Sequence, residues 1–236
     1  MAIHSITYSE KYRRATLHNQ GCNYRCRGCS YRLKPQRVPE RLPSLGDVRA
    51  CLRGLGLEAV HFMGGEPTTN AQLPGLLAFC KESLGVRTRL GHTNGSNLVL
   101  TNLDGMNVSF KGLTDEHYLD YTGQPAQPVY RSFRTAFEAG LELKASTVLI
   151  PGYCDLDQVE GIASFVGGLS RAIPFHLMGF IPVPGAPWSR PSEEAMEEAL
   201  SAIRRHVDTI TSSHLTSEAL VAGTRHDDLF VVERVL

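Results

Sequence analysis

The chain has 236 residues with 24 acidic and 24 basic side chains, so its net charge indicates neither nucleic acid nor a membrane surface as a partner. Apolar residues make up 42% of the chain, which is enough for the core of one domain. No apolar run approaches the roughly 18–20 residues of a membrane span, and the N-terminal residues lack the pattern of an export signal. We therefore expect a cytoplasmic monomer without a membrane partner, and nucleic acid is disfavoured but not excluded.

Apolar runs of strand type alternate with helical patterns along the chain. The expected strands are Arg14–His18, Ala59–Met63, Val86–Leu90, Met106–Phe110, Lys144–Ile150 and Phe175–Ile181. The expected helices are Leu45–Leu55, Leu73–Ser83, Val129–Ala139, Asp157–Leu169 and Glu193–His206. This alternation predicts an α/β fold of parallel strands joined by right-handed crossovers. Six units predict a partial, open (β/α)6 TIM-like barrel.

We expect one domain over residues 1–236, with a core at about 14–182 and a C-terminal helix and tail over 190–236. In parallel α/β folds the site lies at the carboxyl ends of the strands. Polar and glycine-rich segments follow the first four expected strands: three cysteines, then Gly64-Gly65-Glu66-Pro67, Thr93-Asn94-Gly95 and Lys111. The topology alone therefore predicts that these segments converge.

The three cysteines that follow the first expected strand are Cys22, Cys26 and Cys29, spaced C-x3-C-x2-C. A cubane [4Fe–4S] cluster usually takes four cysteine thiolates. Three thiolates within eight residues would leave one iron available to a ligand that is not a cysteine. Thiols in the cytosol stay reduced, so ligands or core residues are favoured over disulfides for all six cysteines.

A zinc site is the alternative for the cysteine triplet. Zinc takes four nitrogen or sulfur ligands, typically in closely spaced pairs. The nearest candidates for a fourth ligand are His4, His18 and Cys51, and none of them forms a second compact pair. Cys51 and Cys80 lie in helical patterns and are expected to be core residues, whereas the role of Cys154 stays open.

The cysteine triplet followed by Gly64-Gly65-Glu66-Pro67 resembles the radical S-adenosylmethionine superfamily over about Leu17 to Pro182. The resemblance implies that Cys22, Cys26 and Cys29 hold a [4Fe–4S] cluster whose fourth iron is chelated by S-adenosylmethionine. It further implies that the GGE strand end contacts the amino group of the methionine part. A carboxylate needs a cation, and Lys111 is our candidate. The expected cofactor-binding residues are Gly64, Gly65, Glu66, Thr93, Asn94, Ser109 and Lys111.

The resemblance narrows to the group of pyruvate formate-lyase-activating enzymes through Thr93-Asn94-Gly95, Ser109-Phe110-Lys111, Tyr121-Thr122-Gly123 and Ile150-Pro151-Gly152. The sixth expected strand is closer to the AmmeMemoRadiSam proteins. The resemblance to this group implies an oxidoreductase that is reduced by a one-electron donor such as flavodoxin or ferredoxin. It also implies that such an enzyme abstracts a hydrogen atom from a glycine of a protein substrate.

The chain departs from the family pattern at two positions. Ser109 stands where the activating enzymes have aspartate, and Gly28 stands where the superfamily usually has an aromatic residue near adenine. Radical modification of another peptide, RNA or a small molecule therefore stays open, as does a non-catalytic zinc or iron–sulfur module. The roles of His176 and Trp188 are open as well. The basic residues Arg25, Arg27, Arg32, Lys34 and Arg37 suggest a docking face for an acidic electron donor.

Overall fold

The computed structural model describes residues 2–33, 41–222 and 232–236. Its strands form one sheet in the order β8-β7-β6-β5-β4-β3-β2-β1-β9. Neighbouring strands from β2 to β8 are parallel, whereas β1 pairs antiparallel with both β2 and β9. The strands are β1 Ala2–Ser9, β2 Arg14–Gln20, β3 Ala59–Met63, β4 Arg87–Thr93, β5 Gly105–Ser109, β6 Glu142–Leu149, β7 Phe175–Gly179, β8 Ile210–Ser213 and β9 Glu233–Arg234.

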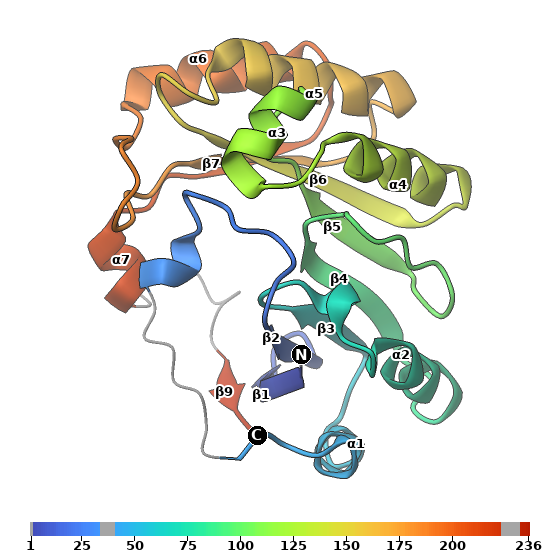
Figure 1. Ribbon diagram of the computed structural model, residues 1–236. Coiled ribbons are helices and arrows are strands. Elements are labelled where there is room, and N and C mark those ends of the chain that lie inside the picture. Colours follow the sequence, from blue (N-terminus) through green and yellow to red (C-terminus); the bar gives the residue numbers. More distant parts are fainter. Residues whose placement is uncertain (1, 34–40, 223–231) are drawn as a thin grey trace.

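Most of the helices lie along the outer side of the curved sheet, whereas the segment that follows β2 crosses the concave side and the short helix over Ser217–Ala222 lies beside that segment (Figure 1). The α-helices are α1 Leu45–Arg53, α2 Leu73–Glu82, α3 Asp115–Thr122, α4 Gln127–Glu138, α5 Leu156–Leu169, α6 Glu193–Arg204 and α7 Ser217–Ala222. Two short 3-10 helices are η1 Ser30–Leu33 and η2 Pro67–Thr69. Local capping sets the start of α1, where Ser44 and Asp47 form a reciprocal capping box. None of the described helices is long and apolar enough to cross a membrane.

The core lies between the sheet and the helices. Phe110, which follows β5, packs against Tyr130 and Phe133 of α4 and Phe165 of α5 at ring-centroid distances of 5.0, 5.2 and 6.0 Å. Such aromatic pairs stabilise beyond the area they bury. The resulting rigid layer holds the carboxyl ends of the central strands in place.

The prediction of an open, partial barrel is confirmed, and β3 has the predicted bounds. The strand count differs, since the described parallel strands number seven and β1 and β9 extend the sheet. The sequence analysis missed β8 because Ile210 is its one apolar residue and the strand lies at a sheet edge. It also missed α3, although Thr114 and Gly123 are the capping residues expected of a helix.

Candidate functional site

The three cysteines lie in the loop between β2 and η1. The Cys22 side chain is exposed, while Cys26 and Cys29 are half-buried. The backbone N–H groups of Arg25 and Arg27 donate hydrogen bonds of 2.9 Å to the carbonyl oxygens at the end of α3. The carbonyls of Tyr121 and Thr122 face the cysteine loop, so the Tyr121-Thr122-Gly123 segment anchors that loop on the end of α3.

The surroundings of the cysteine thiols favour binding of a group that supplies positive charge. Burial raises the pKa of Cys22, and it raises the pKa of Cys26 to about 11 although the nearby Lys111 ammonium lowers it. A metal deprotonates a coordinating thiol outright, so cluster binding would overcome this penalty. The residue set fits a [4Fe–4S] cluster, with one thiolate for each of three irons.

A single metal ion fits the described residues less well. Within residues 2–33, 41–222 and 232–236, no group of three or more His, Cys, Asp or Glu side chains is arranged around a possible ion position. The suggested fourth zinc ligands have other contacts, since the His18 ring bonds to Thr7 at 3.0 Å and Cys51 Sγ faces the Val235 carbonyl at 3.9 Å. Zinc requires four ligands on one ion.

The two glycines after β3 lie against the start of the cysteine loop. Both have a positive φ, +79° at Gly64 and +49° at Gly65. A Cβ atom on Gly65 would lie 2.0 Å from the carbonyl oxygen of Gly21, and one on Gly64 would lie 3.0 Å from the carbonyl oxygen of Asn19. We predicted that the double glycine allows close approach to a ligand, and in the structure it also allows close approach to the chain before Cys22.

Glu66 is fully buried, and its carboxylate connects two strand ends. It accepts hydrogen bonds from the backbone N–H and hydroxyl of Thr68 at 3.1 and 2.7 Å. It also accepts from the Thr93 hydroxyl at 2.7 Å and from the Asn94 N–H at 2.6 Å. An ionised carboxylate has about four acceptor positions. Three of these donors converge on Oε1 and the Asn94 N–H alone bonds to Oε2, so the contacts position Thr93 and Asn94 and leave an acceptor position on Oε2.

Asn94 joins this carboxylate to the cysteine loop. Its side-chain amide donates to Asn23 Oδ1 at 2.8 Å and lies 3.8 Å from Cys22 Sγ. The Asn19 amide donates in turn to the backbone carbonyls of Gly21 and Glu66 at 3.4 and 3.1 Å. The sequence analysis missed Asn19, Asn23 and Thr68. Their positions directly before or beside the motifs were the one available signal.

Ser109 and Lys111 meet at the end of β5. The Lys111 ammonium donates a hydrogen bond of 2.7 Å to the Ser109 hydroxyl, and the Lys111 N–H donates one of 3.0 Å to the Tyr118 hydroxyl. A hollow beside them is lined by Phe110, Lys111, Tyr121, Thr147, Val148 and Ile150. The serine in place of aspartate thus leaves Lys111 without a carboxylate on this strand, while its charge acts on Cys26.

Side chains from other elements fill the space beside Gly28. A Cβ atom at Gly28 would lie 2.5 Å from the Tyr121 hydroxyl and 2.7 Å from a ring carbon of Phe180. Trp188 packs on Tyr121 and Phe180, and its ring centroid lies 4.3 Å from that of Tyr153. The aromatic surface near Cys29 is therefore built from α3 and the loops after β6 and β7, which no local motif reveals.

Other residues singled out in the sequence lie elsewhere. His176 of β7 bonds to Thr211 and Ser213 of β8 at 2.7 and 3.2 Å. Cys80 is buried as predicted, and Cys154 is buried at the isolated bridge with Ile150. Arg27 lies over the Trp188 ring at 4.9 Å and pairs with Asp120 at 2.5 Å. Lys34 and Arg37 fall outside the described residues.

The comparisons with known proteins identify the family of this chain. The family described as the Radical SAM superfamily matches residues 16–166. The chain belongs to this superfamily, as its motifs predicted. The cofactors of the superfamily are a [4Fe–4S] cluster and S-adenosylmethionine, so the cofactor prediction is confirmed. The chain is therefore a radical S-adenosylmethionine enzyme.

Two curated relatives differ in their named activities. A protein of Methanocaldococcus jannaschii whose name proposes a glycyl-radical enzyme activating role is 28% identical over 77% of this chain and 71% of its own length. GTP 3',8-cyclase of Pectobacterium atrosepticum is 31% identical over 55% of this chain and 44% of its own length. The relatives thus support the superfamily without selecting one reaction.

Solved structures share the fold. Streptococcus suis SuiB bound to S-adenosylmethionine has a TM-score of 0.65 at 16% identity, covering 89% of this chain and 52% of SuiB. A domain of pyruvate-formate lyase-activating enzyme from Bacteroides vulgatus has a TM-score of 0.55 at 19% identity, covering 65% of this chain and 98% of the domain. The chain thus spans about half the length of SuiB. At these identities the likeness concerns the fold alone.

Proposed function

We propose that this enzyme generates a 5'-deoxyadenosyl radical at the cysteine loop and uses it to abstract a hydrogen atom from a substrate. The observation that carries the proposal is the convergence of Cys22, Glu66, Asn94 and Lys111 at the carboxyl ends of β2 to β5. When reduced by one electron, the bound cofactors supply methionine and the radical. The cytoplasm, where thiols stay reduced, is the proposed location.

The protein's own residues would orient the cofactors. Cys22, Cys26 and Cys29 would hold the cluster, and the Lys111 ammonium would pair with the carboxylate of S-adenosylmethionine. The backbone at Gly64 and Gly65 would accept from the methionine amino group. Glu66 would hold Thr93 and Asn94 in place, and its Oε2 atom, which accepts a single hydrogen bond among the described residues, would bind the methionine amino group as well. Orientation of reacting groups supplies much of the rate in such sites.

The activation of a glycyl-radical enzyme is the first candidate reaction. It is supported by the named role of the Methanocaldococcus jannaschii relative and by the order of motifs along the chain. The substrate would then be a glycine of a partner protein, with flavodoxin or ferredoxin as the electron donor. Arg27 beside Trp188 lies on the loop that such a donor would approach.

Anaerobic reconstitution with iron and sulfide tests the cofactor chemistry. We expect a brown protein that forms 5'-deoxyadenosine from S-adenosylmethionine after reduction with dithionite. Cys26→Ala should abolish both cluster binding and cleavage, because it removes one of three ligands. Cys51→Ala is the matched control, since Cys51 lies on α1 away from the loop. A Cys26→Ala protein with full iron content and cleavage would contradict the proposal.

A further inference from the structure

The parallel strands present two chemically different faces. Buried apolar side chains such as Val60, Phe62, Leu90 and Val108 point toward the helices and belong to the core. Since side chains alternate along a strand, the residues between them point to the concave side of the sheet. We call this side, over β2 to β8, the inner face. Strand pairing places His61 beside Arg89 and Asn107 beside Lys144 on it.

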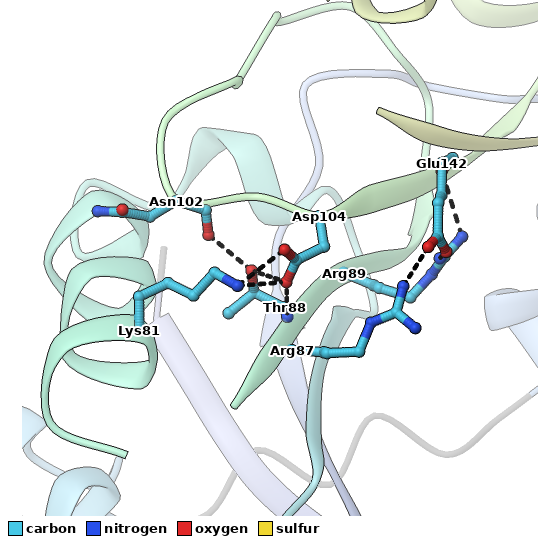
Figure 2. A network of polar contacts seen from close by, with 7 residues as sticks. All are labelled: Lys81, Arg87, Thr88, Arg89, Asn102, Asp104 and Glu142. Carbon is cyan, nitrogen blue, oxygen red and sulfur yellow. Dashed lines mark hydrogen bonds and ion pairs between the residues drawn. The ribbon is translucent and has the colours of Figure 1, made fainter. Parts of the chain in front are cut away.

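The inner face carries an excess of basic groups. Its titratable side chains are Arg14 and His18 on β2, His61 on β3, Arg87, Arg89 and His92 on β4, Glu142 and Lys144 on β6, and His176 on β7. Glu142 is the one carboxylate of this set, and it lies at the amino-terminal end of β6, where it pairs with Arg87 and Arg89 (Figure 2). The carboxylate is therefore already shared by two cations.

One of the basic side chains lacks a partner of its own. Lys144 forms no hydrogen bond or ion pair with the described residues. The Nε atom of Arg14 is also buried without a hydrogen-bond partner, but its guanidinium lies over the Tyr12 ring at 5.3 Å. A cation without a counter-charge is unfavourable, and an acceptor with negative charge beside Lys144 would supply one.

The basic groups act on one another. Burial, together with Arg14 and Arg89, lowers the pKa of His61 to about 3. Burial and Lys144 lower the pKa of His176 to about 4, and burial and Arg89 lower the pKa of Lys144 itself. The Arg89 side chain is 22% exposed, and His61, Lys144 and His176 are half-buried, so these four groups are recessed in the concave sheet. Recessed cations suit a small molecule that enters the sheet better than a macromolecule that rests on its rim.

The inner face leads directly to the candidate site. Strand pairing aligns His176 with Ser146 of β6 and Ser146 with Ser109 of β5, and Ser109 bonds to Lys111. A ligand held over Lys144 would thus lie on the side of the sheet that the cysteine loop crosses (Figure 1). Lys144 itself pairs with Asn107 of β5, two residues before Ser109, so the ligand would lie on the same face as the candidate site and closer to the strand starts.

We propose that the inner face binds a small anionic substrate bearing carboxylate or phosphate groups, with Lys144 as its main binding residue. This inference rests on the proposed function for the identity of the anion as substrate. A small-molecule substrate is the alternative to the glycine of a partner protein, and Lys144, unpartnered among the described residues, is the observation that supports it. The binding itself is a property of the basic inner face.

Isothermal titration of the reconstituted protein with inorganic phosphate and with succinate tests the inference at constant ionic strength. We expect the wild type to bind one or both anions, and the preferred anion identifies the acidic group. Lys144→Gln should weaken binding roughly tenfold, as expected for one lost charged hydrogen bond. Lys144→Arg should retain binding. Arg131→Gln, which removes a charge from the outer helix α4, is the matched control.

Absence of binding to both anions, or equal affinity in wild type and Lys144→Gln, would overturn the inference. Should Lys144→Gln fail to fold by circular dichroism, Lys144→Met, which also removes the charge, provides the same comparison. Formation of 5'-deoxyadenosine by the wild type is measured separately. Cleavage without anion binding refutes this inference alone, whereas anion binding without cleavage refutes the proposed function and leaves the anion site intact.

Discussion

Two carboxylates at opposite ends of the parallel strands show how this sheet separates stability from function. Asp104, directly before β5, accepts from both Lys81 and Thr88 and lies at the amino-terminal ends (Figure 2). Glu66, after β3, lies at the carboxyl ends and is fully buried. Asp104 has a cation as partner and keeps 28% side-chain exposure, whereas Glu66 accepts from neutral donors alone among the described residues.

The difference follows from what each carboxylate holds. Asp104 connects α2 to the starts of two strands, which is a purely structural task. Glu66 holds the segment that contacts the cysteine loop. Its negative charge therefore lies near Cys22, beside the position that the cluster would occupy. A buried charge without a counter-ion is tolerated when several charge-assisted hydrogen bonds satisfy it. In barrels of this kind, the carboxyl ends carry the active site and the amino-terminal ends contribute stability.

The largest expected effect on stability comes from disturbing the close contact between Gly65 and the backbone of Gly21. Gly65→Ala places a Cβ atom 2.0 Å from the Gly21 carbonyl oxygen in a left-handed backbone conformation, so we expect a loss of at least about 4 kcal/mol in unfolding free energy. Urea denaturation measures it. Gly140→Ala is the matched control, because Gly140 also has a positive φ but has nothing within 4 Å of the added Cβ. The control should lose about 1–2 kcal/mol. Equal losses would contradict a close contact at Gly65.

The carboxylate of Glu66 is tested by Glu66→Gln, which replaces one acceptor oxygen with a donor amide. Because four donors face the carboxylate, at least one would be left unpaired, and we expect a loss of about 3 kcal/mol. Binding of S-adenosylmethionine should also weaken, while the iron content stays unchanged. Equilibrium dialysis and iron analysis measure these two quantities. Unchanged stability and affinity would remove Glu66 from both roles.

A smaller effect is expected at the amino-terminal ends. Asp104→Asn should lower the unfolding free energy by about 2 kcal/mol at pH 7, because it weakens charged hydrogen bonds from Lys81 and Thr88. Although burial raises it, the hydrogen bonds from Lys81 and Thr88 lower the pKa of Asp104 overall. The stabilisation is thus present above the pKa of the unfolded state and is lost as the pH falls through the folded pKa. Urea denaturation of both proteins at pH 7 and in acid should show the difference shrinking.

The smallest effect on stability is expected from Asp208→Asn, which compares an exposed aspartate with the partly buried Asp104. Asp208 pairs with Arg171 on the surface, with side-chain exposures of 60% and 52%. Exposed ion pairs contribute little, so we expect a loss below about 1 kcal/mol in unfolding free energy. A loss as large as that of Asp104→Asn would show that burial does not explain the difference between the two aspartates.

Sequence patterns predicted the alternation of strands and helices well, because core strands such as β3 and β6 contain strong apolar runs. They predicted poorly where a strand lies at an edge, as for β8, or pairs antiparallel outside the repeating units, as for β1. The placement of the cysteines and of Thr93 and Asn94 at one end of the sheet followed from topology. It stays a prediction that S-adenosylmethionine is contacted by Gly64, Gly65, Glu66, Thr93, Asn94, Ser109 and Lys111.

The amino-acid sequence by itself determined the superfamily. The cysteine spacing and the glycine-rich strand end are each formed by residues that are close together in the sequence, so short motifs are enough to recognise them. Tertiary structure alone decided what surrounds them. The hydrogen-bonded carboxylate of Glu66, the aromatic rings that occupy the space beside Gly28 and the basic inner face each join residues far apart in the chain. Their physical reason is strand pairing, because the register between neighbours decides which side chains share a face and a strand end.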